Sequence, residues 1–189
     1  TPAVREYSGL FFIITLLIVC IPHGSLDHLI YYKNNGPKVN KVLFYVKYLS
    51  LITVVGIFWI LLPTFSFILF LFISAFHFGQ SQLFRINVPN VLQLPYHLSW
   101  GALLLSIIIL TNLGECLSIF TSLEWLNTAW VTWSNLLLAT VVSLLTFLGI
   151  HTFLLLSKHL KGRYFMFEIV LLIVFTIMSL TTNAIFTFT

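Results

Sequence analysis

Long stretches without a charged residue decide what this chain can fold into. Tyr7–Leu26 is free of charge, and Val42–Phe84 contains Lys47 as its single charged side chain. A helix of about 20 apolar residues crosses the hydrocarbon core of a bilayer. Hydrophobic residues make up 59% of the chain and charged residues only 7%, against about 25% charged in a soluble domain. Because a water-soluble fold could not hide so much apolar surface, the sequence predicts an integral membrane protein.

Six membrane-spanning helices account for the apolar stretches. Val42–Phe84 is too long for one span, and the turn signal Pro63-Thr64 divides it in two. We therefore expect an all-α, polytopic transmembrane helix bundle that forms a single domain over residues 1–189. Since the chain begins with Thr1 and ends in the apolar run Ala184–Phe188, we expect it to be truncated at its C-terminus. The spans are expected at about 7–26, 42–62, 64–84, 94–113, 131–156 and 165–188.

Basic residues give the expected orientation, because cytoplasmic loops are enriched in Lys and Arg. With the N-terminus outside, eight of the nine basic residues fall on the inner side and only Arg5 lies outside. This distribution predicts a multi-pass protein of the cell membrane with an external N-terminus. The net charge of +4 is too small and too scattered to indicate nucleic-acid binding. The inner residues are Lys33, Lys38, Lys41, Lys47, Arg85, Lys158, Lys161 and Arg163.

Three histidines fall inside the expected spans at one depth. The inner ends of their spans, near Tyr32, Arg85 and Lys158, follow His23, His77 and His151 by about nine, eight and seven residues. At the rise of a helix this places the three histidines roughly 10–14 Å from the interface. His97 lies near the inner start of the fourth span and is expected to be shallower. Such a layer favours a shared polar site, and neutral imidazole suits iron, copper or zinc. The alternatives are single histidines bonded to nearby carbonyls, and a proton relay, which would need more carboxylates.

Asp27 is the carboxylate expected closest to this layer. It follows His23 by four residues, so both side chains lie on one helical face. A carboxylate in that position can orient a metal-bound imidazole by accepting its other N–H. The alternative is a partly hydrated aspartate at the membrane interface.

Two motifs carry a resemblance to a known family. Pro22-His23-Gly24-Ser25-Leu26-Asp27 resembles the P-H-G-x-x-D element of the Brp/Blh family of membrane-embedded β-carotene 15,15′-dioxygenases. Phe76-His77-Phe78-Gly79 resembles the H-F-G-x-x-D element of the same family. Weaker similarity continues through Leu148–Thr152, Ser157–His159 and Phe167-Glu168. The resemblance therefore extends over essentially the whole chain.

The resemblance implies a function and a cofactor. Such enzymes cleave the central double bond of β-carotene with O₂ into two molecules of retinal, and they hold one iron ion (Fe²⁺) through four histidines. Two of these match His23 and His77, which would be the catalytic metal ligands in this chain. The other two form an H-x-x-x-H pair after the sixth span, which is expected beyond Thr189. Gln82 departs from the family pattern, which has Asp at this position.

Two other functions remain open. Gln82 and the missing histidine pair favour a non-catalytic membrane carotenoid-binding or carrier protein, whereas the two intact histidine motifs favour the enzyme. A small transporter ranks last, because neither broken helices nor an inverted repeat is evident. The expected partners are β-carotene, O₂ and the lipid bilayer.

Overall fold

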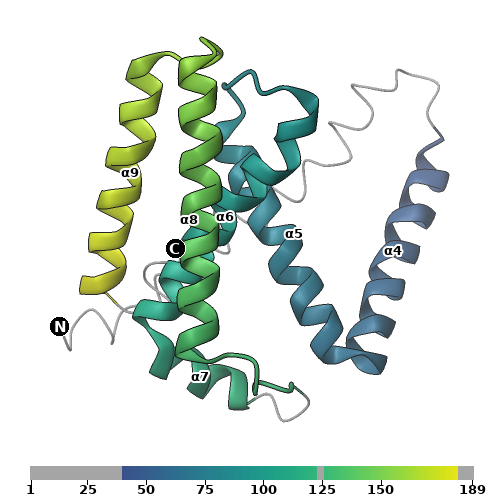
Figure 1. Ribbon diagram of the computed structural model, residues 1–189. Coiled ribbons are helices and arrows are strands. Elements are labelled where there is room, and N and C mark those ends of the chain that lie inside the picture. Colours follow the sequence, from purple (N-terminus) through teal and green to yellow (C-terminus); the bar gives the residue numbers. More distant parts are fainter. Residues whose placement is uncertain (1–39, 123–125, 183–189) are drawn as a thin grey trace.

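A computed structural model describes residues 40–122 and 126–182 of the chain, and in these ranges it contains six helices and no strand. Figure 1 shows them as a bundle in which α6 and α8 lie at the centre. Five of the six are long and apolar enough to cross a membrane. The helices are α4 (Lys41–Leu61), α5 (Pro63–Leu83), α6 (Asn90–Thr111), α7 (Leu113–Ser122), α8 (Trp133–Leu156) and α9 (Gly162–Thr181).

The predicted all-α transmembrane architecture is confirmed. Helices α4, α5, α6, α8 and α9 coincide with the second to sixth expected spans. The first expected span, Tyr7–Leu26, lies outside the described residues. Helix α7 was not predicted as an element of its own. Its Cys116 and Phe120 pack against Ile108 of α6 and Phe175 of α9, so a segment expected to be a loop adds a short helix to one end of the bundle.

Prolines mark the boundaries of the helices. The predicted break at Pro63 is confirmed, because Pro63 is the first residue of α5, where its missing N–H costs no hydrogen bond. Helix α6 begins at Asn90, four residues before the expected start of the fourth span, and carries Pro95 inside it. Pro95 is the sixth residue of α6, beyond the first turn, and so removes one i→i−4 backbone hydrogen bond.

Helices α5 and α6 cross in very close contact at two glycines. A Cβ atom added to Gly79 of α5 would collide with the backbone of His97, and one added to Gly101 of α6 would collide with the backbone of Ala75. Lipid tails are as apolar as the helices, so association depends on close packing, which small residues permit. The crossing therefore fixes the relative position of α5 and α6.

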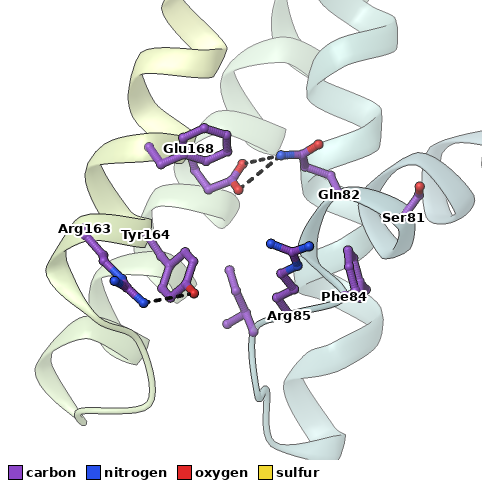
Figure 2. Close-up of a pocket in the computed structure, with 9 residues that line it drawn as sticks. Ser81, Gln82, Phe84, Arg85, Arg163, Tyr164 and Glu168 are labelled. Carbon is purple, nitrogen blue, oxygen red and sulfur yellow. Dashed lines mark hydrogen bonds between the residues drawn. The ribbon is translucent and has the colours of Figure 1, made fainter.

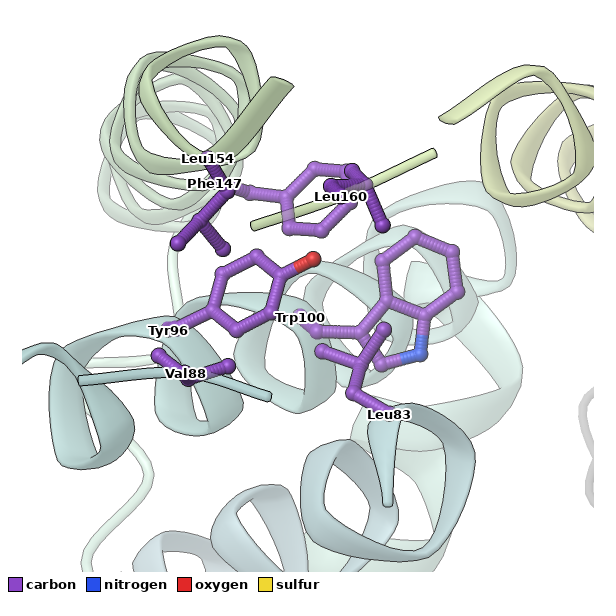
Figure 3. Packing of buried hydrophobic residues seen from close by; sticks show 7 residues of the cluster. All are labelled: Leu83, Val88, Tyr96, Trp100, Phe147, Leu154 and Leu160. Atoms are coloured by element: carbon purple, nitrogen blue, oxygen red, sulfur yellow. The ribbon is translucent and has the colours of Figure 1, made fainter. Parts of the chain in front are cut away.

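A buried cluster on the other face of α6 joins it to α8. Tyr96 and Trp100 of α6 pack against Phe147 of α8, and all three side chains are fully buried (Figure 3). The cluster also draws on the end of α5 and on the loop that precedes α9. Its members are Leu83, Val88, Tyr96, Trp100, Phe147, Leu154 and Leu160.

Helix α4 is the least buried of the described helices. It contacts α5 near their common turn, where Trp59 meets Phe70 at 6.4 Å between ring centroids, and the two helices diverge from there (Figure 1). No described side chain of α4 is buried. Its exposed apolar residues suit contact with lipid tails.

Candidate functional site

His77 lies on α5 and is exposed. It precedes the last residue of α5, Leu83, by six positions, so it sits about 9 Å below the end of the helix. Its ring contacts Phe78 at 6.4 Å between centroids. Neither ring nitrogen is hydrogen-bonded within the described part of the chain. His77 therefore offers an imidazole nitrogen with no internal partner.

The side chain of His77 points away from α6 and towards the α4 side of α5. His77 follows Phe70 by seven residues, which returns to the same helical face, and Phe70 is the residue that contacts Trp59 of α4. Ala75 and Gly79, which contact α6, are each two residues from His77 and lie on the opposite face. The candidate ligand thus faces the region where α4 and α5 diverge (Figure 1).

The glycine of the His-Phe-Gly motif allows α5 to pack closely against α6, which explains why a glycine follows the histidine by two residues. Gly79 is buried against the backbone of His97, and any side chain at this position would push α5 away from α6. Phe76 supports the same crossing through an edge contact with the His97 ring at 5.8 Å. A helix held on one face by this crossing presents its other face, which carries His77, in a fixed orientation.

His151 occupies a different environment, although it was expected in the same layer. It is completely buried in α8, and its Nδ1 lies 2.6 Å from the hydroxyl of Tyr96. Its Nε2 lies 3.5 Å from the carbonyl oxygen of Phe165 on α9. Chemistry assigns the tautomer, because the carbonyl can only accept: Nε2 carries the proton and Nδ1 accepts from Tyr96. With both nitrogens engaged, His151 joins α6, α8 and α9.

His97 lies deeper than the sequence suggested. Because α6 begins at Asn90, His97 is two turns inside the helix, about 10 Å from its start. It is buried, and its Nδ1 has no hydrogen-bond partner among the described residues. Its depth is therefore comparable to that of His77, but it lies on the other side of α5.

The described residues contain no group of three or more His, Cys, Asp or Glu side chains that could hold a metal ion. His23 and Asp27, the other expected site residues, lie outside them. Cys116 is a poor ligand candidate, because burial and, less strongly, the Glu115 carboxylate raise the pKa of its thiol to about 11. His77 is thus the expected ligand whose surroundings the structure describes.

A buried carboxylate between α5 and α9 was missed by the sequence argument. Glu168 of α9 is buried, and Gln82 of α5 donates from Nε2 to both of its oxygens, at 3.2 and 3.3 Å. The signal was present, since Glu168 is an acidic residue inside the expected sixth span. The residue that departs from the family pattern, Gln82, is therefore the partner of this carboxylate.

Comparison with known proteins gives the family. A search of curated proteins and a search of solved structures found no match. A family model described as beta-carotene 15,15′-dioxygenase matches residues 14–188, a range that includes His77 and every described helix. The chain therefore belongs to the β-carotene 15,15′-dioxygenase family.

Proposed function

We propose that this chain carries part of the catalytic centre of a non-haem iron dioxygenase that cleaves the central double bond of β-carotene. The observation that carries the proposal is His77, which lies in the family's His-Phe-Gly motif and whose ring nitrogens have no hydrogen-bond partner among residues 40–122 and 126–182. The close crossing at Gly79 holds the helix that presents it. A ring nitrogen that no described residue occupies is open to a metal ion, and the other ring N–H would need an acceptor to orient the imidazole.

The substrate chemistry suits a site between membrane helices. β-Carotene is an apolar molecule, so a site inside the bilayer avoids the cost of moving it into water. In the proposed reaction the central C=C bond breaks and each carbon gains one oxygen atom of O₂, which gives two molecules of retinal. The apolar helices that flank His77 would exclude water from the reacting bond.

Iron would need ligands from several parts of the chain. The imidazole of His77 fits Fe²⁺, and His23 would supply a second nitrogen, oriented by Asp27. Two further histidines are expected from an H-x-x-x-H pair beyond Thr189. Bound iron would supply the redox chemistry that O₂ requires. His77 would be one of the residues that hold the metal, since its side chain lies on the α4 side of α5.

Elemental analysis and a product assay test the proposal together. Iron and retinal would be measured for this chain and for a version extended along its reading frame, each produced in cells that make β-carotene. For the version that contains the H-x-x-x-H pair, we expect about one iron ion per chain and the formation of retinal. For the chain as given, we expect neither. Full iron loading and full retinal production by the chain as given would contradict the proposed ligand set.

A carotenoid-binding protein without catalysis is the second candidate. It is favoured by Gln82, which replaces the family's Asp and is committed to Glu168. Bound β-carotene, with iron and retinal in neither version, would support this function over the dioxygenase.

The location is part of the same proposal: a multi-pass protein of the cell membrane with its N-terminus outside. Helices α4 and α5 run in opposite directions, so the start of α4 and the end of α5 lie on the side of the bundle at which α8 ends and α9 begins (Figure 1). Lys47 is in the first two turns of α4, and Arg85 follows the end of α5. This basic end would face the cytoplasm. Labelling of single cysteines in intact cells with a membrane-impermeant thiol reagent tests the orientation, since a cysteine at Lys161 would stay unlabelled until the membrane is opened.

A further inference from the structure

A pocket of about 420 Å³ lies between the end of α5 and the start of α9. Figure 2 shows its lining, which combines charged and aromatic side chains. Arg85 follows the last turn of α5, and Arg163 is in the first turn of α9. The pocket is therefore at the level where two membrane-spanning helices meet the interface. Its lining residues are Ser81, Gln82, Phe84, Arg85, Ile86, Arg163, Tyr164, Phe167 and Glu168.

The two arginines are not neutralised by the described part of the protein. The Arg85 guanidinium lies over the Phe84 ring at 5.2 Å, and Arg163 lies over Tyr164 at 4.9 Å. Arg163 also donates to the Tyr164 hydroxyl at 3.3 Å. Neither guanidinium is in an ion pair with a described carboxylate. Both guanidinium groups therefore keep N–H donors free for a ligand. Stacking on the Phe84 and Tyr164 rings restrains the positions of the two guanidinium groups.

The one acidic lining residue does not occupy these donors. Both oxygens of Glu168 accept from Gln82. Glu168 follows the first residue of α9 by six positions, so it lies about 9 Å deeper along the helix. The outer part of the pocket, which holds the arginines, is therefore positive.

Exposed aromatic side chains extend the pocket into the apolar zone. Phe84 is 68% exposed and Phe167 is 54% exposed. In a bilayer such rings meet acyl chains, while the guanidiniums lie at the level of the headgroups. The lining thus matches a molecule with an anionic head and an apolar tail.

We propose that this pocket binds the headgroup of an anionic phospholipid, with its phosphate between Arg85 and Arg163. Guanidinium forks match phosphate oxygens bidentately, and basic pockets between membrane helices are suited to lipid headgroups. The site is separate from His77 and does not depend on iron or on carotenoid cleavage. A bound lipid would connect α5 and α9 on the outer side of the Gln82–Glu168 hydrogen bonds.

Native mass spectrometry of the full chain in detergent tests the proposal. Phosphatidylglycerol and phosphatidylcholine of equal chain length would be titrated against the chain and against the variants Arg85→Gln, Arg163→Gln and Lys161→Gln. Lys161 is the matched control, because it precedes Arg163 by two residues, is exposed and does not line the pocket. We expect phosphatidylglycerol to bind in preference, and each arginine variant to weaken it about fivefold, with less than a twofold effect for the control.

Three outcomes would overturn the proposal. Equal binding of the two lipids would show that the headgroup charge is not recognised. Equal weakening by all three variants would show that general surface charge, and not the pocket, attracts the lipid. Displacement of phosphatidylglycerol by inorganic phosphate at equal concentration would show a site for a free anion, since a lipid site gains affinity from acyl contacts with Phe84 and Phe167. Size-exclusion profiles of the variants confirm that each remains folded.

Discussion

His77 and His151 lie at similar depths on neighbouring parts of the bundle, but their surroundings are opposite. Each is five or six residues from the end of its helix. His77 is exposed on the α4 side of α5 and has no hydrogen bond within the described residues. His151 is completely buried and uses both nitrogens to join α6, α8 and α9. Depth in the membrane therefore does not make two histidines one site; the helical face decides which one can take a ligand.

The largest expected effect follows from this difference. His77→Ala should lower retinal formation at least about 100-fold, because a ligand of the proposed iron would be lost. Thermal unfolding in detergent should stay close to that of the unchanged chain, since His77 is exposed and makes no hydrogen bond to the part of the chain that the structure describes. Retinal is measured by chromatography of cells that make β-carotene and express the reading frame extended to include the H-x-x-x-H pair.

His159→Ala is the matched control for His77→Ala. His159 is an exposed histidine in the loop between α8 and α9, and its loss should change retinal formation by less than about twofold. If the His77→Ala protein formed as much retinal as the unchanged protein, His77 would not be part of the catalytic centre. The contrast between His77 and His151 would then have no consequence for activity.

The contact that orients His77 gives the second prediction. Gly79→Leu should lower the free energy of unfolding by about 3 kcal/mol, because the new side chain must displace the backbone of His97. Gly149→Leu on α8 is the control, since a Cβ there meets nothing within 4 Å, and it should be close to neutral. Denaturant titration followed by circular dichroism measures both. A fully stable Gly79→Leu protein would mean that α5 and α6 do not cross at this glycine.

Much of the fold could be predicted from the sequence, because span length and hydropathy act locally. The charge-free runs and Pro63 gave five helices that the structure contains, with ends shifted by a few residues. Helix α7 was missed, because its ten residues are too short for a membrane span and its packing against Ile108 and Phe175 depends on tertiary contacts.

The candidate site was less predictable, because the direction of each side chain depends on which helix packs against which face. The motif indicated His77 and a glycine that permits close approach, but only the structure shows that the approaching element is α6. The depth argument grouped His151 with His77, and only the positions of Tyr96 and Phe165 show that His151 is engaged elsewhere. In the same way, the sequence alone did not explain why Gln82 stands where the family has Asp. The structure shows that Gln82 donates a hydrogen bond to Glu168 of α9.

The Gln82–Glu168 contact gives the third prediction. Gln82→Glu keeps the shape of the side chain but removes the amide donor and places a second carboxyl group beside Glu168. The free energy of unfolding should fall by about 2 kcal/mol, because the buried acceptor loses its partner. Adding Glu168→Gln inverts the pair and should recover most of the loss. Failure of the double variant to recover would show that the surroundings of Glu168, and not its contact with Gln82, set the cost.

The smallest expected effect concerns the paired histidine. Tyr96→Phe removes the hydroxyl that lies 2.6 Å from Nδ1 of His151 and should cost about 1 kcal/mol, since a buried acceptor is left without a donor. His151→Phe alone leaves the Tyr96 hydroxyl unpaired and should cost a similar amount. In the Tyr96→Phe/His151→Phe protein neither polar group remains, and a phenylalanine can keep the ring contacts with Phe147 and Phe165 at 4.7 Å.

The two single costs should therefore not add in the double variant. A coupling of about 1 kcal/mol in this double-mutant cycle, measured by denaturant titration, would assign His151 a role in joining helices. The corresponding cycle between Tyr96→Phe and His77→Ala should show no coupling, because His77 lies on the face of α5 that is turned away from α6. If His77 and Tyr96 proved coupled as strongly as His151 and Tyr96, the two histidines would share one network after all, and the distinction between a ligand histidine and a packing histidine would fail.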